Sequence, residues 1–173
     1  MNTMYNNLVI AQDFSINLKR KIYKQNKKIA FVCIGTNKVI GDSLGPRVGS
    51  YLKSTTNLEV FGDLKNNVCN KEDIKIISHK LRNKYIIAID SALSNYDDIG
   101  EIYITNKSLK LAEGLNIDKG TIGNICIKAV VARNMNDSYK NFLSLKSVDS
   151  CFIEKLAITV ANNIRKITIK KDI

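Results

Sequence analysis

Apolar residues recur along the chain in two patterns, one typical of buried strands and the other of amphipathic helices. The runs Ile29–Ile34, Tyr85–Ile89 and Ile125–Val131 are continuous, short and rich in β-branched residues. Such runs suit strands that are covered on both faces, as in a parallel sheet. Leu58–Phe61 is a short strand candidate, and the alternating segment Glu101–Thr105 predicts a more exposed strand.

Four further segments space their apolar residues three or four positions apart, as amphipathic helices do. They cover residues 12–26, 43–53, 70–82 and 148–167. The second of them has Asp42 near its cap and Pro46 in its first turn, where proline is tolerated. Because strands and helices alternate along the chain, we expect a layered α/β domain with a largely parallel sheet.

Length and composition fit one folded domain that spans residues 1–173. Hydrophobic residues make up 45% of the chain and charged residues 25%, which is enough apolar surface to exclude extensive disorder. No apolar run approaches the ~20 residues that a membrane-spanning helix needs, so no membrane association is expected. The first residues lack the features of a secretory signal, which predicts a cytoplasmic protein.

The net charge of +11 at pH 7 would suit an acidic partner such as nucleic acid. The composition of that charge disfavours this interpretation, because the basic residues are lysines except for Arg20, Arg47, Arg82, Arg133 and Arg165. No nucleic-acid-binding motif accompanies them. Lysine also shares AT-rich codons with the abundant isoleucine and asparagine, so part of the charge is expected to reflect genome composition. We therefore expect scattered charge on a solvated surface.

Cysteine and histidine are too sparse and too scattered to give a metal site of recognisable spacing. Cys33, Cys69, Cys126 and Cys151 form no CxxC pair, and His79 is the single histidine. Cys33 and Cys126 lie within apolar runs, where cysteine is usually a small buried hydrophobe. We expect four reduced thiols in a cytoplasmic protein, and neither a metal nor another cofactor.

Two aspartates are predicted to meet where buried strands end. Asp42 lies in Gly35–Gly49, the glycine-containing segment after Ile29–Ile34, and Asp90 follows Tyr85–Ile89. Ligand sites of open α/β sheets gather at the carboxyl ends of the strands. We therefore expect Asp42 and Asp90 at the same edge of the sheet.

Paired carboxylates have a chemistry that a single carboxylate lacks, because their mutual repulsion keeps one protonated while the other is ionised. The ionised acid can take a proton from water and the protonated acid can polarise a carbonyl, which is how peptides are hydrolysed without a nucleophilic side chain. Gly35, Gly41 and Gly45 would allow a substrate chain to approach closely. The structural alternative is that Asp42 and Asp90 only cap a helix or tether a loop.

Other patterns of catalysis or ligand binding are disfavoured. The segment after the first strand is neither a Walker A loop nor a GxGxxG loop, which argues against a nucleotide site. Ser43 has no evident histidine partner, and His79 falls within a predicted amphipathic helix. A Ser–His triad is therefore not expected.

The segments CIGTNKVIGDSLGPRVG and IIAIDSALS resemble the YyaC sporulation protein family, which is related to the germination protease of endospore-forming bacteria. GDSLGPRV is similar to the Asp-Ala-Leu-Gly-Pro-Arg-Val stretch of that protease, and IDSAL is similar to its Ile-Asp-Ala-Leu stretch. The resemblance covers residues 28–168, which it implies are the core of the domain, preceded by an N-terminal helical extension. The wider superfamily includes the hydrogenase maturation endopeptidases and implies a three-layer α/β/α sandwich with a mixed, mainly parallel sheet.

For function, the resemblance implies an aspartic-type endopeptidase that acts on small spore proteins in the cytoplasm of the sporulating cell or forespore. The proposed acidic residues of the germination protease correspond to Asp42 and Asp90. Gly35, Thr36 and Arg47 are expected to bind substrate, and Arg47 could equally steady an aspartate or form a structural tether. In the hydrogenase enzymes a histidine joins the acids at the metal of the substrate. This chain has no histidine in its later loops, which disfavours metal-guided cleavage.

Three functions remain open at this point. The first is peptide hydrolysis, and the second is a non-catalytic homologue that keeps the fold and binds a peptide or protein. The third, less favoured, is a basic nucleic-acid-binding protein. The chain is much shorter than the germination protease, so substrate docking need not be shared. The sequence leaves the substrate, the cleaved bond and the oligomeric state undetermined.

Overall fold

The computed structural model describes residues 14–110 and 121–168. Its centre is a five-stranded sheet in the order β2-β1-β3-β7-β4. The strands are β1 (Ile29–Cys33), β2 (Glu59–Phe61), β3 (Tyr85–Ser94), β4 (Ile102–Thr105) and β7 (Ile125–Arg133). The first four strands in that order are parallel and β4 is antiparallel at one edge, so the sheet is mixed and mainly parallel, as expected.

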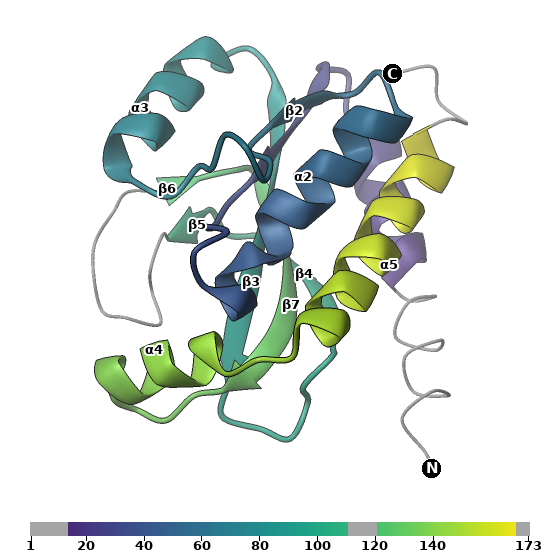
Figure 1. The fold of residues 1–173 in the computed structure, drawn as a ribbon. Coiled ribbons are helices and arrows are strands. Elements are labelled where there is room, and N and C mark those ends of the chain that lie inside the picture. Colours follow the sequence, from purple (N-terminus) through teal and green to yellow (C-terminus); the bar gives the residue numbers. More distant parts are fainter. Residues whose placement is uncertain (1–13, 111–120, 169–173) are drawn as a thin grey trace.

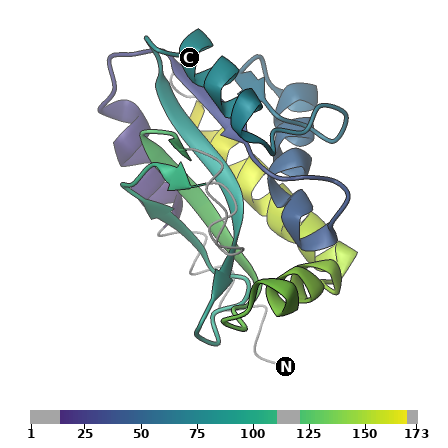
Figure 2. The same ribbon diagram turned by 90° about the vertical axis from the view of Figure 1, so that its left-hand side faces the viewer.

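Helices cover both faces of the sheet (Figure 1). We call one side the α5 face; it is covered by α2 (Leu44–Thr55), α5 (Ser150–Thr168) and the helical residues 14–23. The opposite side, the α3 face, is covered by α3 (Lys71–Lys80) and by a small hairpin of β5 (Leu109–Lys110) and β6 (Thr121–Ile122). Figure 2 views the sheet from the α3 side, with α5 behind it. The expected three-layer α/β/α sandwich is confirmed.

Each face has its own apolar core because successive strand residues point to opposite sides of the sheet. Phe31 of β1 packs on the α5 face with Leu52 of α2 and Ile164 of α5. Val32, the next residue of β1, packs on the α3 face with Ile77 of α3. The core of the α5 face contains more residues, and β1 is buried at every position.

The close packing of α2 on β1 depends on Gly45 in the first turn of that helix. A Cβ atom at this position would lie 2.0 Å from the backbone oxygen of Ile34, so no larger residue fits without a shift of the backbone. Pro46 follows at a position where the helix needs no N–H donor. α3 begins as predicted, because the side chain of Asn70 accepts a hydrogen bond of 2.8 Å from the N–H of Asp73.

The structure differs from the sequence-based expectation in three elements. β3 was predicted to end at Asp90 but continues to Ser94, because β7 keeps pairing with it beyond the end of β1. The helix α4 (Ser138–Lys146) and the β5–β6 hairpin were not predicted. α4 packs against the end of β7 and buries only Asn141 among its residues, so it has little of the apolar periodicity that reveals a helix.

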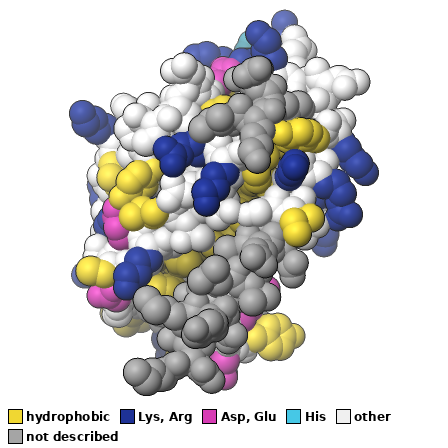
Figure 3. Space-filling model, turned by 90° about the vertical axis from the view of Figure 1, so that its right-hand side faces the viewer, with side chains coloured by type: hydrophobic (Ala, Val, Ile, Leu, Met, Phe, Trp, Pro, Cys, Tyr) yellow, Lys and Arg dark blue, Asp and Glu magenta, His cyan; other side chains and the backbone are white. Residues whose placement is uncertain are grey.

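Two predictions about the surface, on membrane-spanning helices and on scattered charge, can be compared with the structure. Within residues 14–110 and 121–168, every helix is too short or too polar to cross a bilayer. Figure 3 shows one face of the molecule, where lysine and arginine side chains are spread over several parts of the surface and separated by apolar and uncharged groups. Residues 12 and 13 of the first predicted helix lie outside the described residues.

Candidate active site

The candidate active site lies in a crevice between the carboxyl ends of β1 and β3. The connection after β1 leads to β2 on one side, whereas β3 pairs with β1 on its other side. Such a reversal of strand order opens the crevice in which ligands of α/β sheets bind. The pairing of β1 with β3 continues to Ile34, whose N–H donates to the oxygen of Ile89, and Asp90 is the next residue of β3.

A tight turn after β1 brings Asp42 back to this crevice. Gly35 begins the turn with φ +129°, and a Cβ atom on it would lie 2.0 Å from the backbone oxygen of Asp42. The N–H of Thr36 donates both to that oxygen, at 3.1 Å, and to Oδ2 of Asp42, at 3.0 Å. Asp42 lies in the 3₁₀ helix η1 (Ile40–Ser43), which contacts β3.

Asp42 lies near the cap of α2, as expected. The helix begins at Leu44, and Ser43, the residue after Asp42, occupies the cap position without a side-chain hydrogen bond to the helix N–H groups. The carboxylate instead holds the turn that carries Thr36.

The loop after β2 braces the same turn. Asn67 accepts hydrogen bonds through Oδ1 from the hydroxyl of Thr36, at 3.1 Å, and from the N–H of Asn37, at 3.0 Å. Its own amide donates to the backbone oxygen of Asp63 at 2.8 Å. The buried carboxylate of Asp63 then forms an ion pair with Lys53 of α2 at 2.5 Å. Thr36 is thus fixed from two sides, by Asp42 and by Asn67.

Opposing effects set the pKa of Asp63. Burial raises it, but the ammonium of Lys53 and the N–H groups of Asn66 and Lys65 outweigh that effect. The result is a pKa of about 2, below the ordinary value of 3.8. Asp63 therefore stays ionised in the folded protein and ties α2 to the loop that supports Thr36.

Asp90 is half-buried within β3 rather than at its end. One carboxylate oxygen accepts a hydrogen bond of 2.8 Å from the N–H of Ser91. By strand alternation its side chain shares the α3 face with the buried Ala88. The residue opposite Asp90 on β7 is Lys128, which interrupts an otherwise buried apolar strand.

Arg47 lies in α2 and reaches away from Asp42 toward α5. Its guanidinium forms an ion pair with Glu154, and it donates to the hydroxyls of Ser43 and Ser150, each at 3.1 Å. The hydroxyl of Tyr51 also donates to Glu154. This hydrogen bond and the ion pair with Arg47 hold the pKa of Glu154 below its usual range, despite partial burial. The carboxylate steadied by Arg47 is thus Glu154, and substrate binding by Arg47 stays a prediction.

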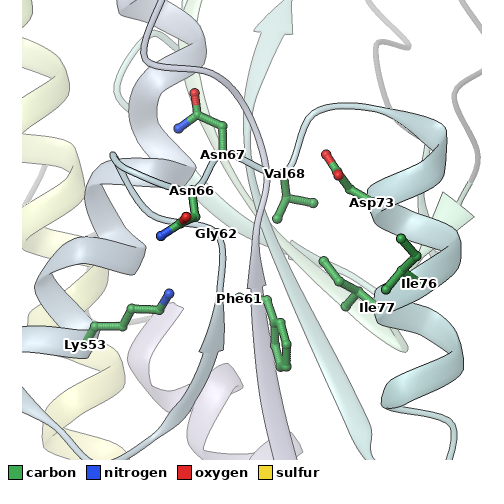
Figure 4. Close-up of a pocket in the computed structure, with 9 residues that line it drawn as sticks. All are labelled: Lys53, Phe61, Gly62, Asn66, Asn67, Val68, Asp73, Ile76 and Ile77. Atoms are coloured by element: carbon green, nitrogen blue, oxygen red, sulfur yellow. The ribbon is translucent and has the colours of Figure 1, made fainter.

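A cavity of about 260 Å³ lies next to the braced turn, on the α3 side of β2. Figure 4 shows its walls, which come from α2, from β2 with the loop after it, and from α3. Asn67 lines the cavity and also binds Thr36, so the cavity adjoins the turn. Asp42 and Asp90 do not line it.

Histidine and cysteine contribute little to this edge of the sheet. Across residues 14–110 and 121–168, no group of three or more His, Cys, Asp and Glu side chains could hold a metal ion. His79 is exposed in the last turn of α3. All four cysteines are free, as expected, and Cys33 and Cys126 are buried. Burial raises the pKa of the Cys33 thiol far above its ordinary range, so it is an inert core residue.

Comparison with known proteins agrees with the sequence resemblance. The family model described as "Protein of unknown function (DUF1256)" matches residues 2–171. The chain belongs to the DUF1256 family. It is 37% identical over 110 residues to the uncharacterized protein YyaC of Bacillus subtilis (strain 168). That match covers 61% of this chain and 54% of YyaC, so the chain spans about half the length of this relative.

The fold of this DUF1256 chain is also found in a solved enzyme structure. The [NiFe] hydrogenase maturation protease HycI from Thermococcus kodakarensis KOD1 superposes with a TM-score of 0.57. The alignment covers 87% of this chain and 97% of HycI at 16% sequence identity. At that identity the likeness shows a shared α/β fold, which is the fold class expected from the sequence.

Two residues of the site in this DUF1256 chain were missed from the sequence. Asn67 has no signal of its own, because its role depends on a loop that folds back on Thr36. Lys128 does have a signal in the sequence, since it is the single charged residue inside the apolar run ICIKAVV. A lysine in a strand buried on both faces requires a partner, and this could have directed attention to the opposite strand.

Proposed function

We propose that this protein is an aspartic-type endopeptidase whose paired acids are Asp42 and Asp90. The observation that carries the proposal is the position of both residues at the switch point between β1 and β3. The shared fold with a maturation protease supports a protease-like architecture. Gly35 and Thr36 form the wall of the crevice beside Asp42, where a peptide backbone could lie against the turn.

The chemistry divides between the two carboxyl groups. Asp90 takes a proton from a water molecule whose oxygen attacks the carbonyl carbon of the scissile peptide bond. Protonated Asp42 donates to the carbonyl oxygen, so that no free oxyanion forms. When the tetrahedral intermediate collapses, the carbon–nitrogen bond breaks and the proton held by Asp90 passes to the leaving amine. Asp42 recovers its proton from the new carboxyl group, and no oxidant or other co-reactant is consumed.

We assign the ionised role to Asp90 because a lysine lies opposite it in the sheet. A nearby ammonium group favours the charged form of a carboxylic acid. Asp42 lies in η1, outside the sheet, and accepts a backbone hydrogen bond from Thr36 on Oδ2.

The substrate class and the location follow from the family resemblance. We propose small proteins of the spore as substrates, and the cytoplasm of the sporulating cell or forespore as the site of action. The turn beside Asp42 presents backbone groups and the short polar side chains of Thr36 and Asn67, which suits an extended polypeptide better than a compact charged ligand.

Asn variants of the two aspartates test the proposal. Asp42→Asn and Asp90→Asn should each lower the rate of cleavage of small DNA-protecting spore proteins by at least about 100-fold, because each removes one acid–base group. Since the two acids act as a unit, the double variant should be little worse than either single variant. Asp97→Asn is the matched control, because the Asp97 side chain is 89% exposed and has only a surface ion pair with Arg133.

Circular dichroism and thermal unfolding should show that all three variants remain folded, and the assays should span mildly acidic to neutral pH. Full activity in both Asp42→Asn and Asp90→Asn would exclude the aspartic mechanism. If the wild-type protein cleaves none of these proteins, a second function is favoured instead.

That second function is peptide binding without cleavage. It is supported by the cavity beside Asn67, which adjoins the turn but is not lined by Asp42 or Asp90. In that case Asp42 would serve to hold Thr36, and a bound peptide should contact Asn67 and Val68. Binding of a spore-protein peptide that survives in Asp90→Asn but weakens in Asn67→Ala would support this function over hydrolysis.

A further inference from the structure

Lys128 is a charged residue in β7, a strand that otherwise contributes mainly buried apolar residues to the core. The residues on either side of it in β7, from Ile125 to Ala132, are all buried, whereas Lys128 is half-buried. β7 lies inside the sheet, between β3 and β4, so Lys128 has a strand on both sides. An ammonium group placed there without a compensating partner would destabilise the fold.

The strand register brings two ionisable side chains beside Lys128. Asp90 is its register partner on β3, and Tyr103 is its register partner on β4. Because neighbouring strands lie about 4.8 Å apart, a long lysine side chain can reach a residue directly opposite it. All three side chains lie on the α3 face, which they share with Cys126 of β7. They form a row across the sheet, which begins at the crevice and ends at the edge strand.

The electrostatics of Tyr103 show that the ammonium group is felt on this face. Burial raises the pKa of the Tyr103 hydroxyl, and the positive charge of Lys128 opposes that rise. Asp98 and Glu101, on the connection to β4 and at its start, act on the same hydroxyl in the opposite sense to Lys128. The charge of Lys128 therefore acts on the α3 face, on which Asp90 also lies.

We propose that Lys128 is a positioning residue of the proposed peptidase site, where it acts as the cationic partner that orients and holds the Asp90 carboxylate at the crevice. This inference rests on the proposed function for its catalytic consequence, but the pairing of Lys128 with Asp90 stands on the strand register alone. It gives the two aspartates different surroundings: Thr36 donates a backbone N–H to Asp42, whereas Asp90 has Lys128 as its register partner on β7. That asymmetry is what an acid–base pair needs.

The pairing is tested without any assay of activity. The titration of the Asp90 carboxyl is followed by carbon-detected NMR in the full-length protein and in Lys128→Met, which keeps the length of the side chain and removes its charge. The pKa of Asp90 should rise by about one or more in Lys128→Met, because the favourable charge is lost. Lys128→Arg should keep the wild-type titration, and Lys155→Met, which removes an exposed lysine of α5, should leave it unchanged. An Asp90 titration that is the same in wild type and in Lys128→Met would overturn the proposal.

The catalytic consequence is tested separately. If the wild type cleaves peptide, Lys128→Met should lower kcat by about tenfold or more with little change in KM. The acid limb of its pH–rate profile should move to higher pH. Lys128→Arg should restore both the wild-type kcat and the wild-type acid limb. A purely structural lysine would change the stability of the fold without moving the acid limb. If the NMR result holds and the wild type has no activity, the proposed function fails while the pairing stands.

Discussion

The two faces of the sheet are built differently along their length. On the α5 face, apolar side chains extend from the amino ends of the strands to their carboxyl ends, and three helical segments cover them. On the α3 face, the apolar core is smaller and is covered by α3 and the β5–β6 hairpin. Beyond Ala88 this face carries the ionisable residues Asp90 and Lys128.

This contrast separates stability from chemistry within a single sheet. The side chains on the α5 face form the larger apolar core, and they supply most of the apolar surface that the sheet buries. The α3 face gives up part of that burial beyond the end of β1, where Asp90 and Lys128 lie opposite each other on the paired strands β3 and β7. The predictions below test how completely the two roles are separated, in order of decreasing expected effect.

The largest effect on stability is expected from a cavity on the α5 face. Ile164 is fully buried in α5, whereas Ile77 of α3 retains 8% of its exposed surface at the margin of the smaller core. Ile164→Ala should lower the free energy of unfolding by about 4 kcal/mol, and Ile77→Ala by about 2 kcal/mol. Urea unfolding of both variants measures the difference. Equal losses would mean that the two cores contribute alike.

A smaller effect is expected where α2 touches β1. Alanine in place of a helical glycine ordinarily stabilises by about 1 kcal/mol, but the Cβ of Gly45→Ala would collide with the backbone of Ile34. We expect a loss of about 3 kcal/mol in the free energy of unfolding. The matched control is Ser54→Ala, an exposed site near the end of the same helix. A stabilised Gly45→Ala variant would show that α2 can move away from the sheet.

The buried carboxylate of Asp63, in the loop that supports Thr36, should make the free energy of unfolding depend on pH. The folded-state pKa of Asp63, about 2, is lower than the ordinary 3.8, so its contribution is complete above pH 4 and is lost as the pH falls toward 2. The difference between wild type and Asp63→Asn should therefore be about 2 kcal/mol at neutral pH and should shrink across that acidic range. Thermal unfolding from pH 2 to pH 7 measures it. Asp97→Asn, at an exposed position, is the control variant, and a constant difference for Asp63→Asn would contradict the assignment.

The smallest effect is expected from the polar link between α2 and α5. The side chains of Arg47 and Glu154 are 22% and 36% exposed, so their ion pair is partly screened by solvent. Arg47→Met should lower the free energy of unfolding by about 1 kcal/mol, and it should leave peptide cleavage unchanged if Arg47 is only a tether. A rise in KM for this variant would instead support the predicted contact of Arg47 with substrate.

The sequence was most informative where local patterns suffice. The apolar run of β1, the cap of α3 at Asn70 and the four-residue spacing of α5 each determine their element without help from distant residues. The glycine-containing segment was correctly predicted at the carboxyl end of β1, because parallel strands place their loops there. The same reasoning predicted Asp42 and Asp90 at one edge of the sheet, and their action as a pair stays a prediction.

What the sequence did not show depends on pairings between distant segments. β3 passes beyond Asp90 because Ser94 finds Arg133 on β7, and no local pattern encodes that register. The partner of Arg47 is Glu154, which lies in the last helix. α4 exposes Tyr139 and has little apolar periodicity, so it resembles a polar loop in sequence. Roles that depend on such contacts required the structure.

The strand order also has a consequence for how the molecule assembles during synthesis. β7 is inserted between β3 and β4, although both of those strands precede it in the chain. Until β7 is made, β3 presents an unpaired apolar edge and β4 has no partner in the central sheet, a state prone to pairing with other chains. Strand pairings this distant form slowly. The surroundings of Asp90 are therefore completed late, when β7 pairs with β3 and brings Lys128 opposite it.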